Sequence, residues 1–289
     1  MRAARLHEIG GAPQIDEVDP PAGETLEVVA VPLNPVDIAI GTGRFYGGSP
    51  DTPYVIGSEA VGRTEDGRLA WWRGPATAAE RAVPGELVEV PEGVAPEAAA
   101  VCGIAGVTGW LAVSWRAPVR EDDTVLVLGA SGTVGSIALQ AAKLLGAKRV
   151  IGAARHVDAV PDAADEKVDV HGDLPEASLI VDALWGDPFE RALAAAAHGG
   201  RIVHLGQSAG PTATLPSAAV RGKMIDLHGH SLFAIPHDVV ARGFRELCVH
   251  VAAGRIGTAV EAYPLDRVAE AWERQATGSP RAKIVLTLS

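Results

Sequence analysis

Cysteine is scarce in this chain of 289 residues, which contains only Cys102 and Cys248. Two cysteines cannot form a disulfide framework or a cysteine-rich zinc site. Both lie in apolar stretches, where a cysteine usually behaves as a small buried hydrophobic residue. The scarcity therefore excludes a small disulfide-stabilised scaffold and the four-cysteine class of structural metal site.

Basic charge is also in short supply, because 25 Lys and Arg residues face 36 Asp and Glu, for a formal net charge of −11. Nucleic acids and anionic membranes need a concentrated basic face, so neither is an expected partner. The chain has no run of eighteen uncharged apolar residues, which a membrane span would need. The N-terminal segment "MRAARLHEIG" carries charges where a signal peptide is apolar. We expect a soluble, cytoplasmic protein with a small-molecule partner.

The length and the 47% hydrophobic content predict two domains. The first hundred residues are rich in Pro and Gly, with short runs such as "LEVVAVPL" that predict strands without long helices. From about Asp123, helical alanine-rich stretches separate several apolar runs of strand length, namely "TVLVLG", "RVIGAA", "SLIVDAL", "GRIVHLG" and "MIDLHGH". This alternation predicts a doubly wound α/β domain with a parallel sheet, and a helical stretch and a strand, "AKIVLTLS", end the chain.

A glycine-rich segment, "LVLGASGTVGSIALQ", joins the first of these strands to a helix. Glycines spaced G-x-x-G-x-x-G permit a tight turn and let backbone amides approach a pyrophosphate at the helix N-terminus. Ordinary strand-to-helix turns also use glycine, but the strand, the amphipathic helix and the second strand together favour a dinucleotide site. The predicted contacts are Gly129, Ser131, Gly132, Thr133, Val134 and Gly135. The predicted helix has an apolar stripe of Val134, Ile137, Ala138, Ala141, Leu144 and Leu145 and stops at Gly146.

The second strand of this unit ends without an acidic residue. Asp or Glu there binds the adenine ribose diol and repels a 2′-phosphate, whereas this chain has Ala154 followed by Arg155. A guanidinium can bind a phosphate through paired, charge-assisted hydrogen bonds. We therefore predict NADP(H) rather than NAD(H), and the alternative is that Arg155 is a solvated surface residue.

With these residues in view, the chain resembles the zinc-independent quinone oxidoreductase branch of the medium-chain dehydrogenase/reductase superfamily. Nearly the whole chain takes part, through "NPVDIAIGTGRF", "PYVIGSEAVG", "GVAPEAAAVCGIAGVTGWLAV", the glycine loop, "VDALWGDPFERALAAAAHGGRIVHLGQS" and "AKIVL". The resemblance implies a GroES-like β-barrel catalytic domain, 1–113 and 246–289, and a Rossmann dinucleotide-binding domain, 114–245. It also implies an active site between them and, with the apolar segment "KMIDLHGHSLF" at a sheet edge, a homodimer.

Zinc alcohol dehydrogenases of the same superfamily hold their catalytic zinc with Cys, His and Cys, and the matching positions here are Asn34, Ser58 and Ile104. An amide and an isoleucine do not suit zinc, so we expect no metal. His228 and His230 lack a convergent third ligand and are expected to be packing or surface residues. Without a Lewis acid, simple alcohol oxidation loses its usual activation. The expected reaction is hydride transfer to a quinone or an activated C=C bond.

The resemblance also places polar groups near the nicotinamide or its ribose. Asn34 and Thr108 are expected to stabilise the developing enolate, whereas Asp37 has either a catalytic or a structural role. Lys283 matches a family position that can reach the cofactor phosphates. The other implied cofactor contacts are Gly206, Gln207, Ser208, Ser231, Leu232 and Phe233. Each of these side chains can also be structural.

One departure from the family concerns the proton donor. Family members often carry a tyrosine two residues beyond the aspartate, where this chain has Ala39 and only Tyr46 and Tyr54 nearby. Water then becomes a candidate donor. The departure also leaves a second hypothesis open, in which the chain is an NADPH-binding redox sensor or accessory protein with little turnover. A short-chain reductase is excluded because no tyrosine is followed by lysine in a Y-x-x-x-K pattern.

Overall fold

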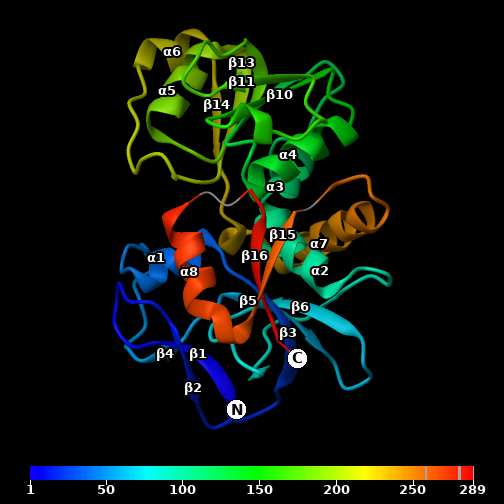
Figure 1. Ribbon diagram of the computed structural model, residues 1–289. Helices are drawn as coiled ribbons and strands as arrows, with labels where there is room; N and C mark the ends of the chain where they lie inside the picture. Colours follow the sequence, from blue (N-terminus) through cyan, green and yellow to red (C-terminus); the bar gives the residue numbers. More distant parts are fainter. Residues whose placement is uncertain (258, 279–280, 289) are drawn as a thin grey trace. The chain divides into compact units, whose positions relative to one another are not determined.

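The computed structural model describes residues 1–257, 259–278 and 281–288 (Figure 1). Contacts divide the chain into two compact units. Unit 1 comprises Met1–Ala105, Phe244–Ala253 and Thr258–Ser289, and unit 2 comprises Gly106–Gly243 and Gly254–Gly257. The sequence placed the two crossings after residues 113 and 245. The predicted first crossing differs from the observed one, which follows Ala105. One long helical stretch continues through this region, so no change in residue pattern marks the crossing.

Unit 2 contains a six-stranded parallel sheet in the order β11-β10-β9-β12-β13-β14. Its strands are β9 (Thr124–Leu128), β10 (Arg149–Ala154), β11 (Glu166–Asp169), β12 (Ala177–Asp182), β13 (Ala196–His204) and β14 (Asp226–Gly229). Its helices are α3 (Val107–Leu111), α4 (Thr133–Leu144), α5 (Gly186–Ala195) and α6 (Ser217–Gly222). The predicted doubly wound α/β class is confirmed, and β11, which carries Glu, Lys and Asp, was missed because it has no apolar run.

Alternate residues of these strands face different helices. Leu126, Ile180 and Ile202 lie in one buried cluster with Phe189 of α5. On the other face α4 lies against β10, where a Cβ on Gly152 would be 2.8 Å from Leu139. The sheet is therefore covered on both sides, which leaves its carboxyl edge for ligands.

The predicted helix after the glycine loop is α4, and its stop is confirmed because Gly146, at φ +92°, follows it directly. Ile137, Ala138 and Ala141 of the predicted stripe are buried. Leu144 and Leu145 are 36% and 39% exposed, so that part of the stripe is wrong. At this end of α4 the apolar spacing continues although the side chains are exposed.

Unit 1 is built mainly from antiparallel strands. One sheet has the order β2-β1-β4, and a second has the order β15-β16-β3-β5-β6-β8 with β7 also paired to β3. The strands are β1 (Arg2–Leu6), β2 (Gln14–Glu17), β3 (Leu26–Pro32), β4 (Tyr54–Val55), β5 (Glu59–Arg63), β6 (Leu69–Arg73), β7 (Arg81–Ala82), β8 (Val88–Glu89), β15 (Val260–Pro264) and β16 (Lys283–Thr287). The helices that contribute to it are α1 (Pro35–Gly41), α2 (Pro96–Val101), α7 (His237–Ala252) and α8 (Val268–Thr277).

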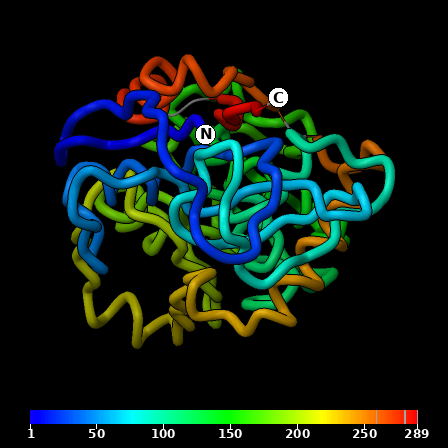
Figure 2. Tube along the Cα trace, turned by 90° about the horizontal axis from the view of Figure 1, so that it is seen from below, coloured from blue at the N-terminus to red at the C-terminus, as the bar shows by residue number. Residues whose placement is uncertain are grey.

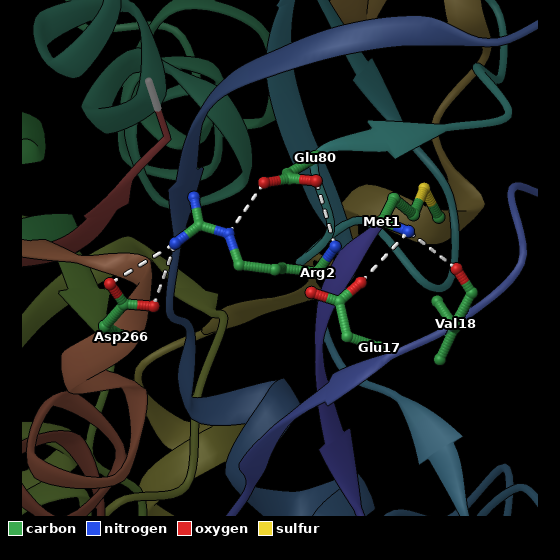
Figure 3. Close-up of polar contacts among 6 residues, drawn as sticks. All are labelled: Met1, Arg2, Glu17, Val18, Glu80 and Asp266. Carbon is green, nitrogen blue, oxygen red and sulfur yellow. Dashed lines mark hydrogen bonds and ion pairs between the residues drawn. The ribbon is translucent and has the colours of Figure 1, made fainter.

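The two ends of the chain meet within unit 1. Figure 2 shows the N-terminal hairpin beside α8, which contacts β2. The Arg2 guanidinium bridges Glu80 and Asp266, and the amino group of Met1 donates to the Val18 carbonyl at 2.8 Å (Figure 3). These pairs are mostly exposed, so the shared core that includes Leu6, Trp72 and Trp272 supplies most of the stabilisation.

Both cysteines are buried and free, as predicted. They lie in hydrogen-bonding contact in unit 1, and this contact and burial raise the pKa of the Cys102 thiol. A thiol with a raised pKa is a poor nucleophile. The pair therefore acts as packing.

One helical stretch, Pro96–Arg116, is long and apolar enough to cross a membrane by length and composition. The sequence prediction excluded such a run because Gly, Ser and Thr interrupt the apolar residues. Of its most apolar window, 83% is buried inside the protein. That degree of burial is typical of a core helix.

Candidate cofactor site and active site

The glycine loop lies between β9 and α4, at the carboxyl edge of the sheet in unit 2. Gly129 has φ +74°, and its amide donates to the Ala153 carbonyl at 2.9 Å. A Cβ on Gly135 would lie 2.3 Å from the Gly129 carbonyl oxygen, so no larger residue fits there. No side chain caps α4, so the amides of its first turn remain available to an anion. The glycines keep side chains out of the loop, so a pyrophosphate can approach its backbone amides.

Arg155 directly follows β10 and is exposed. Its guanidinium has no ion pair or hydrogen bond in the described part of the chain. Ala154, before it, is buried, so no acidic side chain stands at the end of this strand. An unpaired guanidinium next to the glycine loop suits a phosphate on the adenosine ribose.

The predicted LGQS turn is attached to the residues that follow β12. Leu205 donates its amide to the Asp182 carbonyl at 2.9 Å, and Ser208 Oγ donates to the Ala183 carbonyl at 3.2 Å. A Cβ on Gly206 would be 2.8 Å from that same Ala183 oxygen. The turn therefore needs glycine where its backbone passes β12, while Gln207 and Ser208 are exposed to solvent.

Asp182 organises this edge of the sheet, and the sequence analysis missed it. Its fully buried carboxylate accepts hydrogen bonds from the amides of Leu184 and Trp185, at 2.9 and 3.0 Å. It also lies 2.9 Å from Nδ1 of His204, its register partner on β13. A carboxylate only accepts, so Nδ1 carries a hydrogen.

Trp185 adopts an unusual backbone conformation, with φ +58° and ψ −167°. This region is essentially restricted to glycine and costs about 1–3 kcal/mol for other residues. The indole ring stacks on Phe189, with centroids 4.2 Å apart, and contacts the His204 ring at 4.1 Å. These two contacts and the Asp182 bond hold the strained residue in place.

Thr108 and the segment Ser231–Phe233 also belong to unit 2. Thr108 lies on α3, and its carbonyl oxygen is 3.2 Å from Nε2 of His230. Ser231 and Phe233 are exposed, whereas Leu232 is 3% exposed. The structure thus brings Thr108 close to the residue that precedes the predicted nicotinamide segment.

In unit 1, Asn34, Asp37 and Lys283 lie in one buried polar cluster. Lys283 Nζ donates to Asn34 Oδ1 at 2.5 Å and to the Leu33 carbonyl at 2.9 Å. Asn34 Nδ2 donates to Glu59 Oε1 at 2.8 Å and to the Pro32 carbonyl at 3.3 Å. Both amide hydrogens are therefore engaged within the protein. In this arrangement both hydrogens of the Asn34 side chain are engaged, so its predicted direct role stays a prediction and would require one of these bonds to break.

Glu59 also belongs to this cluster, and the sequence analysis missed it. Its carboxylate also accepts from Trp71 Nε1 at 2.6 Å and from the Ile104 amide at 2.7 Å. A Cβ on Gly103 would be 2.1 Å from Oε2, so glycine is required beside the carboxylate. Burial raises the pKa of Glu59 to about 7, although Lys283 and the donors oppose the rise.

The same burial acts on the other charged groups. It lowers the pKa of Lys283 to about 8, against the attraction of Glu59 and Asp37. It raises the pKa of Asp37, whose carboxylate accepts hydrogen bonds from Ser58 Oγ at 2.5 Å and from the backbone N–H of Asn34 at 2.7 Å. The Lys283 ammonium, on a residue 3% exposed, lies inside unit 1. Its predicted contact with cofactor phosphates would require it to leave these partners.

The three positions that match zinc ligands all belong to this cluster, in which Asn34 bonds Lys283, Ser58 bonds Asp37, and the Ile104 amide bonds Glu59. The described residues contain no group of three or more His, Cys, Asp or Glu that could hold a metal. Amide, hydroxyl and peptide N–H groups are a poor donor set for zinc.

The family profile of zinc-binding dehydrogenases matches residues 145–286. Human quinone oxidoreductase is 26% identical over 100% of this chain and 98% of its own length. A phenolphthiocerol/phthiocerol polyketide synthase of Mycobacterium tuberculosis is also 26% identical over 100% of this chain, which spans only 14% of that protein. The quinone oxidoreductase of Thermus thermophilus, whose structures include an NADPH complex, superposes with a TM-score of 0.85 at 26% identity, and each chain is covered completely.

These similarities agree with the glycine loop, the parallel sheet and the antiparallel unit described above. The chain is similar over its whole length to quinone oxidoreductases of the medium-chain dehydrogenase/reductase superfamily. The predicted resemblance is confirmed.

Proposed function

We propose that this protein is an NADPH-dependent oxidoreductase that reduces a quinone or an activated C=C bond. The proposal rests on two neighbouring features: a glycine loop whose backbone leaves no space for side chains, and the exposed guanidinium of Arg155 directly after β10. The loop fits the pyrophosphate, and the guanidinium fits the 2′-phosphate. The NADPH complex of the related Thermus thermophilus enzyme supports this choice of cofactor.

NADPH, when bound, supplies a hydride. The residues of unit 2 hold it through Gly129–Gly135, Arg155, the LGQS turn and Ser231–Phe233. Thr108 stays the proposed polar group beside the acceptor, whereas the buried amide of Asn34 holds the Glu59 and Lys283 side chains in place. A neutral hydroxyl and backbone amides stabilise an enolate or hydroquinone anion as it forms but do not ionise an alcohol. An acceptor activated by conjugation therefore suits this site.

The test is hydride transfer from NADPH deuterated at C4 to a panel of quinones and enones. With an enone, deuterium should appear on the β-carbon of the product; with a quinone it exchanges out through the hydroquinone hydroxyl, and slower oxidation of the deuterated NADPH reports the transfer instead. Thr108→Val should lower turnover by up to about 10²-fold with little change in the Kd for NADPH. Ser114→Ala, in the same helical stretch, is the matched control and should retain activity. Binding of NADPH without turnover on any acceptor would favour the redox-sensor hypothesis instead.

We propose that the reaction needs no zinc, because the three ligand positions carry donors that already bond protein groups. Treatment with EDTA should leave NADPH binding and turnover unchanged. Stoichiometric zinc that is lost together with activity would contradict this.

We further propose a cytoplasmic homodimer. β14 is the last strand of the six-stranded sheet, and its Asp226, Leu227 and Gly229 are exposed. An unpaired strand edge tends to be covered by another chain. Light scattering at micromolar concentration should give twice the mass of one chain, and the mass of a single chain would reject the dimer.

A further inference from the structure

His230 directly follows β14 and is 7% exposed. Its Nε2 lies 3.2 Å from the Thr108 carbonyl oxygen. Because a carbonyl oxygen only accepts hydrogen bonds, Nε2 carries the hydrogen, and Nδ1 of the neutral ring is unprotonated and can accept a hydrogen bond. Burial lowers the pKa of His230 to about 4; Arg116 also lowers it, while the bond to Thr108 acts in the opposite direction. The imidazole is therefore neutral near pH 7.

Nδ1 of His230 is buried and has no hydrogen-bond partner in the part of the chain that the structure describes. Leaving such a group without a partner is destabilising, because it has lost its hydrogen bonds to water. An apolar side chain of similar size would fill the same space without that cost. The unpaired acceptor therefore calls for a donor that the free chain lacks.

The chemistry of the atom restricts the ligand. A neutral nitrogen lone pair attracts an N–H or O–H donor and does not attract a phosphate, whose oxygens are themselves acceptors. In a nicotinamide dinucleotide the candidate donors are the carboxamide of the nicotinamide, the adenine amine and the ribose hydroxyls. The ligand end is therefore an amide, amine or hydroxyl.

The order of strands selects among these donors. β10, which Arg155 directly follows in the chain, is separated from β14 by β9, β12 and β13. At about 4.8 Å between neighbouring strands, the ends of β10 and β14 lie about 19 Å apart. The glycine loop after β9 lies between them. With the adenosine phosphate at Arg155 and the pyrophosphate at the loop, the nicotinamide half extends toward the end of β14.

We infer that Nδ1 of His230 accepts a hydrogen bond from the carboxamide N–H of the nicotinamide and so fixes the orientation of that ring. This rests on the proposed function. Because Nδ1 is buried in the free chain, binding requires a local shift near the turn that follows. Ser231 and Phe233 in this turn are exposed, the latter by 52%, so apart from Leu232 a shift disrupts little packing.

The test compares NADP⁺ with its 3-acetylpyridine analogue, in which a methyl group replaces the amide nitrogen. Dissociation constants are measured by titration calorimetry for the wild type and for His230→Phe. The wild type should bind NADP⁺ about 3- to 10-fold more tightly than the analogue, as expected for one neutral hydrogen bond. His230→Phe should bind both alike, at the weaker value. His228→Phe, within β14, is the matched control and should discriminate as the wild type does.

Nitrogen NMR of the wild type provides a second measurement that needs no variant. The Nδ1 resonance of His230 should move when NADP⁺ binds and stay in place when the analogue binds. Unchanged discrimination in His230→Phe, or an equal response of the resonance to both ligands, would overturn the inference and leave NADPH dependence intact. A wild type that binds neither ligand would overturn the proposed function as well.

Discussion

The ammonium of Lys283 donates a hydrogen bond to the amide oxygen of Asn34, at 2.5 Å, in the interior of unit 1. Asn34 is one of the three positions that the resemblance matches to zinc ligands of the zinc dehydrogenases. Here the Lys283 ammonium donates to Oδ1 of Asn34, and Nδ2 of Asn34 donates to the Glu59 carboxylate at 2.8 Å. Asn34 is therefore part of a buried charge network, and this network has consequences for stability and for pH dependence.

Glu59→Gln should remove a pH dependence of folding. The pKa of Glu59 is raised from its unfolded value near 4.5 to about 7, so between these values the native state binds more protons than the unfolded state. The free energy of unfolding of the wild type should therefore fall as pH rises from 5 to 7, by at most about 1.4 kcal/mol per unit, and this contribution should level off above about pH 8.

Urea denaturation of both proteins at pH 5, 6 and 7 checks this. The free energy of unfolding of the wild type minus that of Glu59→Gln should decrease across the series. Lys283 loses the attraction of Glu59 in the variant, which lowers its pKa further and changes the difference in the same direction. A difference that rises with pH would contradict a raised pKa.

Arg155→Ala should change the choice of cofactor. Loss of a charge-assisted bond to the 2′-phosphate should weaken NADPH binding about 10- to 100-fold, whereas NADH, which lacks this phosphate, should bind as before. Fluorescence titration gives both dissociation constants. Arg149→Ala, at the other end of β10, is the control because Arg149 pairs with Glu166. Equal affinities for NADPH and NADH in the wild type would reject the assignment.

Gly135→Ala should damage the cofactor loop. Its Cβ would lie 2.3 and 2.7 Å from backbone atoms of Gly129, so the loop must open, with a loss of stability of about 1–3 kcal/mol and weaker NADPH binding. At Gly132 the nearest atom would be 3.5 Å away, an ordinary contact. Gly132→Ala is therefore the matched control. Thermal unfolding of both variants should show a clear loss of stability in Gly135→Ala alone, and NADPH titration should show weaker binding by Gly135→Ala than by the wild type.

Trp185 offers a direct measure of backbone strain. Trp185→Ala and Trp185→Gly both lose the stacking on Phe189 and His204, but only glycine relaxes at φ +58°, ψ −167°. Trp185→Gly should consequently be more stable than Trp185→Ala by about 1 kcal/mol, the reverse of the usual order of these residues. Chemical denaturation gives the difference. The usual order would show that the residue is not strained.

Local patterns determined the parallel sheet, the glycine loop and the place of Arg155. Strand-length apolar runs, a helical stripe and glycine spacing are properties of neighbouring residues, so they can be recognised before folding. The same local signals failed at β11, whose residues are polar, and at the end of α4, where the apolar spacing continues although the side chains are exposed.

Tertiary structure alone decided which polar groups meet. Asn34 is 25 residues from Glu59 and 249 from Lys283 along the chain, and their contacts depend on which strands are neighbours. Asp182 finds His204 through the register of β12 and β13, and Nδ1 of His230 becomes an unpaired acceptor only when the fold buries it. Burial then raises the pKa of Glu59 and lowers that of Lys283, because the free energy of a charge depends on the medium around it. The sequence carried these residues without a local sign of their partners, since hydrogen bonding and desolvation act through space.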